Sequence, residues 1–326
     1  MKTIFIIFLA FCMCTGMMFA GCGEKERMAE LKMQVLEKDT IWTGTVVLDG
    51  DIYVPPGVTL TIKPGTVIKF KKIDAHSGQN MFGTQSPYFP EAELIVRGRI
   101  VARGSAKENI VFTSFEIGAQ PKDWGAINLL GSNNNLIEHC KIMFARNGVQ
   151  SYGAEAQVCN SEFVENGEGI SIKNEEEDHM LPWYGKVSDI EISHSRFYNN
   201  DSGISVRNSK AGISHNLIEN NKYAGIVFRG RAGALVTYNE IIGNKEGICL
   251  YQGGKVRIEH NNIYDNTDYN IVAAEAQSFD IEAPKNWFGT IDTEKIDKSI
   301  FDRQDKHDLE KVIYKPFLLK RINWEE

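Results

Sequence analysis

One sequence pattern recurs four times between residues 189 and 274, and it limits the folds that this chain can adopt. Each copy starts with a β-branched residue, places His or Tyr two positions later, continues with Ser or Asn, and then reaches a second Asn. The copies are Ile192-x-His194-Ser195-x-Phe197-x-x-Asn200, Ile213-x-His215-Asn216-x-Ile218-x-x-Asn221, Val236-x-Tyr238-Asn239-x-Ile241-x-x-Asn244 and Ile258-x-His260-Asn261-x-Ile263-x-x-Asn266. Their interval of roughly 22 residues lies among the periods of solenoid proteins, so the sequence predicts a stack of similar coils.

The residue types within the repeat indicate β-strands. Leucine-rich repeats share this period and also place an Asn in each turn, but their Leu-x-x-Leu-x-Leu core and helical return are missing here. β-branched residues dominate instead, and these favour strands. Short alternating segments punctuated by Pro-Gly turns also occur upstream, from Val54 to Phe70. We therefore predict a β-solenoid in which equivalent residues of successive coils lie about 4.8 Å apart.

Composition supports a folded, turn-rich β protein and argues against nucleic-acid binding. The 326 residues are 42% hydrophobic and 24% charged, which is enough apolar material for a sizeable core. The chain has 29 glycines but only 9 prolines, as is typical of turn-rich β structure. The net charge is −7, and it becomes −8 when Lys2, the one charged residue among the first 21, is left out. A surface this acidic is poorly suited to neutralising phosphates.

Residues 1–21 have the features of a signal peptide. Lys2 precedes an apolar run over residues 4–20 that is short for a membrane span. Phe19-Ala20-Gly21-Cys22 resembles a bacterial lipobox, which implies a lipid on Cys22; an ordinary signal cleavage nearby is the alternative. Gly23 after the cysteine resembles the context of outer-membrane lipoproteins. We expect a protein of the cell envelope that is tethered to the outer membrane by this lipid, on its periplasmic or surface side.

The rest of the chain divides into a tether, a coil and a cap. Residues 22–40 are polar and charged, and we expect a partly helical tether there. Residues 41–290 should form the coil, interrupted by a loop at 71–92 (the first excursion) and a second at 174–187 (the insert). Residues 291–326 should cap the coil, since an open solenoid end exposes unpaired strand edges. The cysteines of the body occupy unrelated places in their repeats, so we expect no essential disulfide: Cys140, Cys159 and Cys249.

Several short motifs occur in an order that resembles bacterial right-handed parallel β-helix proteins. They are Pro56-Gly57-Val58-Thr59-Leu60, Pro64-Gly65-Thr66, Gly98-x-Ile100-x-Ala102-x-Gly104, Phe112-Thr113-Ser114, Trp124-Gly125 and Asn286-Trp287-Phe288-Gly289-Thr290. The resemblance extends from about residue 41 to residue 317 and includes the NosD-like and pectate-lyase-like groups. It implies an all-β, right-handed parallel β-helix with N- and C-terminal caps. It implies no single activity, because the superfamily mixes lyases, hydrolases, epimerases, binding proteins and structural proteins.

One column of the repeat holds aromatic and imidazole rings. Strand alternation predicts that these side chains point into the coil and fill one of its corners as a stack: His194, His215, Tyr238 and His260. Because NosD-like proteins are linked to copper-site maturation, a metal relay along the column is the alternative. Tyr238 interrupts the histidines and no carboxylate accompanies them, which favours the structural stack.

Two further columns should belong to the framework. The first should be a ladder of side chains that bond from turn to turn, made of Ser195, Asn216, Asn239 and Asn261. The second should occupy corners that need either a positive φ or a tight backbone, made of Gly203, Gly225 and Gly247, with Asn270 in the equivalent place.

An outward column of basic and aromatic residues is the first candidate for function. Each rung closes on a Gly-Ile or Gly-Val pair, as in Gly203-Ile204. Counting three residues beyond this closing Ile or Val gives Tyr152, Lys173, Arg207, Arg229 and Tyr251. Guanidinium groups bind carboxylate or sulfate, and tyrosine faces stack on sugar rings, so this column predicts a site for an anionic glycan. The alternative is a solvated face whose charges pair with the acidic insert.

The insert is the second candidate. Glu175, Glu176, Glu177 and Asp178 could supply oxygen ligands to Ca²⁺, and Trp183 with Tyr184 could form a platform for a sugar. The acids lack the alternating spacing of a known calcium loop, so an acidic surface loop without metal or cofactor is the preferred interpretation.

No catalytic set emerges from the repeats. Glycoside hydrolysis needs two carboxylates flanking one bond, and no column of the aligned rungs stacks two acids in adjacent rungs. We therefore predict a membrane-tethered, non-catalytic β-helix that binds extended glycans or acts as an envelope scaffold. A lyase, hydrolase or epimerase acting on uronate polymers is the first alternative, and a NosD-like accessory factor in metal-site assembly is the second. The sequence leaves the ligand and the oligomeric state open.

Overall fold

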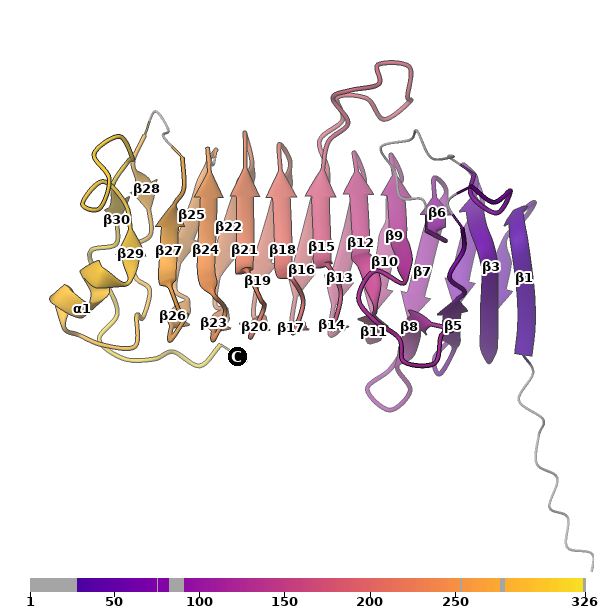
Figure 1. The fold of residues 1–326 in the computed structure, drawn as a ribbon, viewed down its shortest axis with the longest axis horizontal. Helices are drawn as coiled ribbons and strands as arrows, with labels where there is room; N and C mark the ends of the chain where they lie inside the picture. Colours follow the sequence, from indigo (N-terminus) through magenta and orange to yellow (C-terminus); the bar gives the residue numbers. More distant parts are fainter. Residues whose placement is uncertain (1–27, 75, 82–90, 253, 276–278, 325–326) are drawn as a thin grey trace, which may run out of the picture.

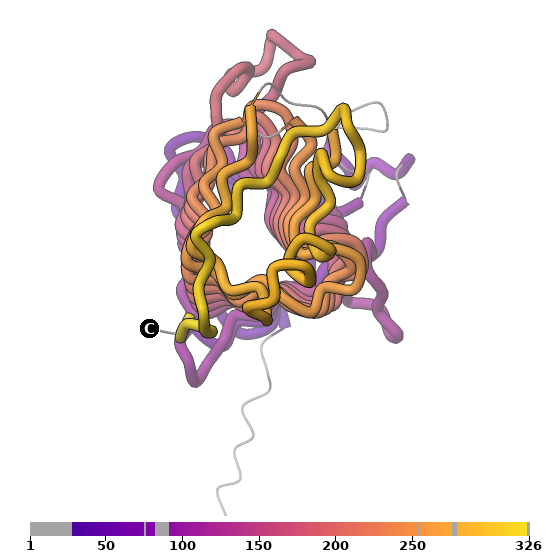
Figure 2. The backbone as a smooth tube through the Cα atoms, turned by 90° about the vertical axis from the view of Figure 1, so that its left-hand side faces the viewer, coloured from indigo at the N-terminus to yellow at the C-terminus, as the bar shows by residue number. Residues whose placement is uncertain are grey.

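A computed structural model describes residues 28–74, 76–81, 91–252, 254–275 and 279–324. The predicted signal peptide and the predicted lipidation site, Cys22, lie outside the described residues. The strands stack along one long axis (Figure 1), and the backbone winds around a common core when viewed along that axis (Figure 2). Neighbouring strands of successive coils are parallel. These observations confirm the predicted parallel β-solenoid. No helix within the described part of the chain is long and apolar enough to cross a membrane.

Each coil contributes strands to three faces. The long face contains β3 (Thr45–Val54), β6 (Leu94–Val96), β9 (Trp124–Leu130), β12 (Ala145–Tyr152), β15 (Glu168–Lys173), β18 (Ser202–Arg207), β21 (Ala224–Arg229), β24 (Glu246–Tyr251), β27 (Tyr269–Ala273) and β29 (Ile300–Phe301). The second face contains β2 (Thr40–Trp42), β4 (Thr59–Ile62), β7 (Arg99–Arg103), β10 (Asn135–Glu138), β13 (Glu155–Cys159), β16 (Asp189–Ser193), β19 (Lys210–Ser214), β22 (Gly233–Thr237) and β25 (Val256–Glu259). The third face contains β5 (Val67–Phe70), β8 (Ile110–Ser114), β11 (Cys140–Met143), β14 (Glu162–Val164), β17 (Arg196–Tyr198), β20 (Leu217–Glu219), β23 (Glu240–Ile242) and β26 (Asn262–Tyr264).

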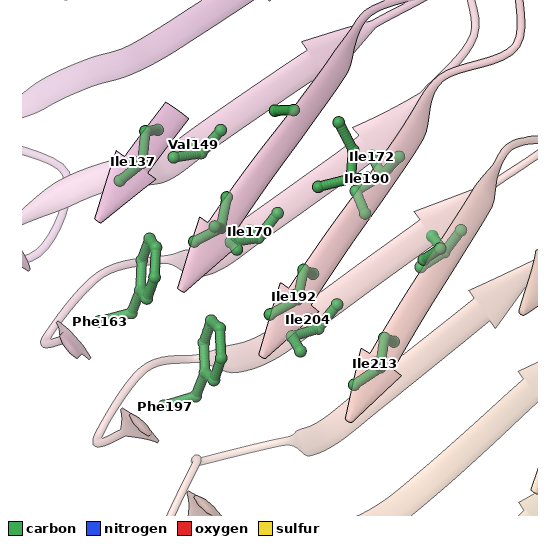
Figure 3. Packing of buried hydrophobic residues seen from close by; sticks show 14 of the residues in the cluster. Ile137, Val149, Phe163, Ile170, Ile172, Ile190, Ile192, Phe197, Ile204 and Ile213 are labelled. Carbon is green, nitrogen blue, oxygen red and sulfur yellow. The ribbon is translucent and has the colours of Figure 1, made fainter. Parts of the chain in front are cut away.

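The core is built from ladders of identical or similar side chains. Ile170 pairs with Ile204 across β15 and β18, and Ile192 pairs with Ile213 across β16 and β19 (Figure 3). The rings of Phe163 and Phe197 stack with their centroids 4.7 Å apart. Because the repeat places the same residue type at the same point of each coil, every rung buries the apolar face of the next.

The predicted asparagine ladder is confirmed, and a second one runs beside it. The Ser195 backbone N–H donates to the Asn216 side-chain oxygen. The Asn216 amide then donates to Asn239, and the Asn239 amide donates to Asn261 in the following coil. Each amide Nδ2 also donates to a backbone carbonyl of the coil, as Asn239 does to Ile213 at 2.8 Å. The second ladder joins the final Asn of each repeat and consists of Asn166, Asn200, Asn221, Asn244 and Asn266.

The ring column is stacked as predicted, but it lies on the surface and not inside the coil. Successive centroids are 5.0, 5.2 and 5.5 Å apart in the series His194, His215, Tyr238 and His260. Each of these residues has a φ between 50° and 57°, which is left-handed backbone. One left-handed residue breaks the strict alternation of side chains along a strand, so the interior placement was wrong.

The structure also corrects one part of the glycine prediction. Gly203, Gly225 and Gly247 are absent from the positive-φ glycines of the described chain. They are needed for close approach instead: a Cβ on Gly203 would lie 2.5 Å from the carbonyl oxygen of Gly225 in the next coil. Of the two reasons offered for this column, the tight backbone is therefore the correct one.

The N-terminal part of the body is more ordered than a tether. Met28–Val35 forms β1, which pairs in parallel with β3 and so continues the stack by one strand. The expectation of a partly helical tether as far as residue 40 was wrong over this stretch. The backbone amides and carbonyls at the edge of β3 need hydrogen-bond partners. Pairing with β1 satisfies them more fully than a loose segment would.

The C-terminal segment packs over the last coils and then turns back along them. It includes β28 (Ile281–Glu282), helix α1 (Thr293–Lys298), β29 and β30 (Val312–Ile313), with Asp292 capping α1 (Figure 1). Beyond β30, the Ile322 backbone exchanges two hydrogen bonds with the Asn262 side chain. Arg321 pairs with the buried Glu240 at 2.8 Å.

Candidate functional site

The outer surface of the long face carries its side chains in straight rows. Strand alternation sends every second residue outward, and the parallel register places equivalent residues of adjacent coils side by side. The cationic row consists of Tyr152, Lys173, Arg207, Arg229 and Tyr251, the predicted column. Two residues upstream lies the floor row, made of Asn128, Gln150, Ser171, Ser205, Val227 and Cys249.

The two arginines of the cationic row are exposed and have no acidic partner. Neither Arg207 nor Arg229 forms an ion pair with any residue that the structure describes. The Arg229 guanidinium lies 4.4 Å from the centre of the Tyr251 ring. The acidic insert pairs with a different arginine, Arg231, at 3.9 Å through Glu176. The alternative in which the insert neutralises this row therefore applies to Arg231 and not to Arg207 or Arg229.

These arginines line an open groove of about 590 Å³. Tyr251 lies along it, and Phe279 contributes an aromatic ring that is 46% exposed. Glu275 is the acidic residue among those that line the groove. Arg231 also lines the groove, which therefore combines three guanidinium groups with two aromatic side chains on a protein of negative net charge.

At its N-terminal end the long face is covered by a group of apolar side chains, which we call the roof. Trp183 and Leu181 of the insert, Met81 of the first excursion and Tyr152 pack together over outward residues of β3, β6 and β9, namely Tyr53, Ile95 and Leu130. Figure 2 shows the insert projecting beyond the outline of the coil before it returns. Two loops that are far apart in sequence thus meet on one face.

Trp183 is part of this roof and is not an exposed platform for a sugar. It is only 3% exposed, and the Arg97 guanidinium lies 4.8 Å from its ring centre. A Cβ on Gly131 would lie 2.9 Å from the Cβ of Trp183, so the glycine lets the indole approach. The prediction for Trp183 was therefore wrong, whereas Tyr184 is on the surface at 45% exposure.

The acidic residues of the insert accept hydrogen bonds from the insert itself and from the neighbouring coil. Glu175 is buried and accepts the backbone N–H groups of Glu177 and Asp178. Glu176 accepts hydrogen bonds from Asn174 and Asn208. In the part of the chain that the structure describes, no three His, Cys, Asp or Glu side chains are grouped so that they could share a metal ion.

Two acids beside the roof lie in adjacent rungs. Alignment of the rungs in the sequence did not predict this pair. Asp51 and Glu93 are both fully buried and directly precede the paired residues Ile52 and Leu94. Asp51 accepts the backbone N–H groups of Met81 at 2.7 Å and of Glu93 at 2.8 Å. Burial raises the pKa of Asp51 to about 6. Burial, and then the charge of Asp51, raise the pKa of Glu93 well above its usual range.

The floor row next to these acids contains polar atoms that lack partners. The Asn128 amide donates to the Glu93 carboxyl group at 3.3 Å, and Gln150 accepts a hydrogen bond from Asn147 at 2.6 Å. The other ends of these amides are buried and unpaired, as is the next hydroxyl of the row: Asn128 Oδ1, Gln150 Nε2 and Ser171 Oγ. Among described residues, the other two such atoms, Arg97 Nε and Glu168 Oε2, belong to the same face.

The comparisons with known proteins concern the whole coil. The family description "Right handed beta helix region" matches residues 124–288, and "Pectate-lyase like beta helix domain" matches residues 34–205. Protein bark beetle of Drosophila melanogaster is 43% identical over 70 residues, which are 20% of this chain and 2% of that protein. The chain therefore spans a small fraction of that relative's length.

Solved structures with a similar trace include the periplasmic alginate epimerase AlgG. A substituted form is 14% identical with a TM-score of 0.40, over 86% of this chain and 73% of the epimerase chain. The unsubstituted form is 12% identical with a TM-score of 0.34, over 86% and 74% of the two chains.

Proposed function

This chain belongs to the right-handed β-helix proteins with a pectate-lyase-like domain, and from that premise we propose that its long face binds an extended, anionic glycan. The observation that carries the proposal is the pair of exposed arginines, Arg207 and Arg229, which sit in register and have no described acidic partner. Unpaired guanidinium groups on a protein with a net charge of −7 are suited to a ligand that brings its own carboxylate or sulfate groups.

The spacing of the rungs supports a polymer as the ligand. Successive rungs repeat the same outward position about every 4.8 Å, so a chain of repeating acidic units can meet a cation at more than one unit. Tyr251 and Phe279 offer aromatic faces for pyranose rings beside the two cations. The function is therefore binding along the outer face of the coil, without chemistry.

Calorimetry with oligogalacturonate, oligomannuronate and a sulfated oligosaccharide tests this proposal. Arg207→Ala combined with Arg229→Ala should weaken binding by at least about 100-fold, because each charge-assisted hydrogen bond contributes roughly 1.5–3 kcal/mol. The matched control is Arg103→Ala combined with Arg257→Ala, which removes the same charge from the second face. Equal losses in both double variants, or no binding of any of the three probes by the unaltered protein, would contradict the proposal.

A lipid on Cys22 completes the proposal, because it would hold the groove at the surface of a membrane in the cell envelope. A tethered binding protein meets polymers at high local concentration. Cys22→Ser should abolish incorporation of a radiolabelled fatty acid and release the protein from the membrane fraction. Labelling that persists in this variant would contradict the anchor.

A uronate-processing enzyme is the second candidate, and the buried acids Asp51 and Glu93 favour it. Their places in adjacent rungs of the glycan-facing surface are suited to general acid-base work, although the roof would have to open for a substrate to reach them. Unsaturated or reducing ends released from the same oligosaccharides, with loss of that activity in Glu93→Gln, would establish catalysis. Unchanged oligosaccharides after prolonged incubation would exclude cleavage.

A further inference from the structure

The long face has one open end and one closed end. From β18 to β24 the cationic row borders an open groove. At β9 and β12 the path along the same face meets Leu130 and Tyr152, over which Trp183 and Leu181 are packed. A chain lying on Arg207 and Arg229 and running toward the N-terminal coils therefore meets the roof. It cannot continue past β12 along the surface.

The unpaired polar atoms lie in the rungs where such a chain would stop. Their side chains are fully buried, so the side chains that cover them must move aside before a sugar can reach them. Asn128, Gln150 and Ser171 occupy consecutive rungs of the floor row, on β9, β12 and β15. They offer one unpaired acceptor, one donor and one hydroxyl. Beyond β18 the same row turns apolar, with Val227, Cys249 and Val272 forming a buried cluster. The unmet hydrogen-bonding capacity is thus confined to the rungs next to the roof.

Buried polar atoms without partners cost stability, roughly 1–3 kcal/mol each, and usually mark a place where a ligand or water supplies the missing bond. Sugar hydroxyl groups both donate and accept, so they match this mixed set. The burial of this region favours hydroxyls over carboxylates, because Asp51 and Glu93 are already buried beside Asn128 and a further carboxylate would have to lose its hydration next to them. The cations that attract acidic units begin only with Lys173.

We propose that the long face recognises the end of its glycan: the acidic units lie on the cationic row, and the hydroxyl groups of the terminal unit pair with Asn128, Gln150 and Ser171 beside the roof. This inference rests on the proposed function, since it assumes that the chain lies on the arginines. It adds a direction, with the terminal unit toward β9, and a stoichiometry of one protein for each chain end.

Calorimetric stoichiometry distinguishes end recognition from binding along the chain. The probes are a short and a long size-fractionated oligogalacturonate, titrated into the purified full-length protein at equal molar concentrations of chains. End recognition gives one protein per chain for both lengths. A ratio that grows with chain length contradicts end recognition but leaves the proposed function intact, whereas no binding of either probe contradicts the proposed function itself.

Substitutions in the floor row test the residues involved. Ser171→Ala removes an unpaired polar atom, so it should maintain or raise the melting temperature while weakening binding of the short probe by about 10-fold or more. Gln150→Met removes the unpaired Nε2 together with the acceptor of the Asn147 bond, so it should weaken binding by a similar factor and lower the melting temperature. Ser205→Ala, one rung further in the same row, is the matched control and should leave binding within about twofold. Unchanged affinity in Gln150→Met and Ser171→Ala would assign the unpaired atoms to the framework and overturn the proposal.

Discussion

From β18 to β24 the long face is open and its floor row becomes apolar, whereas from β3 to β12 the same face lies under the roof and buries two carboxylic acids. The first region repeats its sequence almost without change, its buried asparagines satisfy one another, and its buried Glu240 is paired with Arg321. The second region breaks the repeat with two loops and buries groups that are charged or unpaired. The comparison indicates that the regular rungs combine a framework of mutually satisfied asparagines with an exposed cationic surface, whereas the irregular rungs bury groups that need a proton or a further partner.

The largest effect should come from breaking the asparagine ladder in the regular region. Asn239→Leu removes bonds to the backbone of Ile213 and Thr237 and to the side chain of Asn261, and it leaves several buried partners unpaired. We expect a loss of about 5 kcal/mol in the free energy of unfolding, measured by urea denaturation. Gln157→Ala, an exposed amide on the second face, is the control and should change it by under about 0.5 kcal/mol. Similar midpoints for the two variants would contradict the role of the ladder.

The roof should be nearly as sensitive, but only locally. Trp183→Ala removes the central ring of the cluster and should cost about 4 kcal/mol in protection of the surrounding residues, because a large buried aromatic leaves a cavity. Hydrogen exchange should rise in residues 94–96 and 124–130 and stay unchanged in residues 236–264. Tyr184→Ala, the exposed neighbour, should leave both segments unchanged. Equal deprotection of the two segments would show that the regions are not independent.

The buried acids predict that the roofed region loses stability as pH rises. A carboxyl group with a raised pKa holds its proton more tightly in the folded state, so its contribution is complete below the unfolded value and is lost as pH rises through the folded value. For Asp51, from 3.8 to about 6, this contribution is on the order of 3 kcal/mol. Glu93 should extend the loss to higher pH. Protection of residues 46–54 should fall between about pH 4 and about pH 7.

Glu93→Gln is the test of this pH dependence. The variant has no charge to bury, so protection of residues 46–54 should fall less between about pH 4 and about pH 7 than in the unaltered protein. Glu155→Gln, an exposed acid on the second face, should keep the original profile. If protection of residues 46–54 depended on pH in the same way in both variants, Glu93 would not be a cause of the pH dependence.

The smallest effect, of opposite sign, should occur at the ring stack of the regular region. Burial and the neighbouring His194 lower the pKa of His215 from 6.5, so its contribution is present above that value and is lost as pH falls through the lowered one. His215→Asn keeps a residue that tolerates the left-handed backbone and removes the ring, which should cost about 1 kcal/mol or less. Hydrogen exchange of residues 213–218, compared at neutral and acidic pH in the unaltered protein and in His215→Asn, measures both the cost of the substitution and the loss of protection in acid. If acid strengthened protection there, the assignment would be wrong.

The fold could be predicted because the same pattern of strand and turn residues recurs in successive coils. β-branched residues at a fixed interval define the strands, and an Asn at the same place in each coil defines a ladder whose bonds the structure contains. The error at His194 arose because period-two alternation holds only within a strand. A single residue with φ near 50° follows the strand and carries its own side chain to the surface, while the next side chain of the repeat is buried.

The candidate site could be predicted only where the repeat is clean. Counting from the closing Ile aligned Arg207 with Arg229 correctly. Glu93 and Asp51 could not be aligned in the same way, since the first excursion separates them in sequence. Trp183 was misplaced because the groups that bury it, Arg97 and Gly131, are far from it in the chain. The one signal that could have found Glu93 is an acid directly before the uninterrupted apolar strand Leu94–Val96.

The pairing of Arg321 with Glu240 has a consequence for synthesis of the chain. Glu240 is 2% exposed and accepts hydrogen bonds from Asn262, Tyr264 and Arg321, the last of which is 81 residues further along. Coils leave the ribosome in order, so β23 is complete well before its cation exists. Until Arg321 emerges, Glu240 has no positive charge beside it and must stay hydrated or protonated. The coils around β23 can therefore reach their final packing only after the segment that crosses them has been translated.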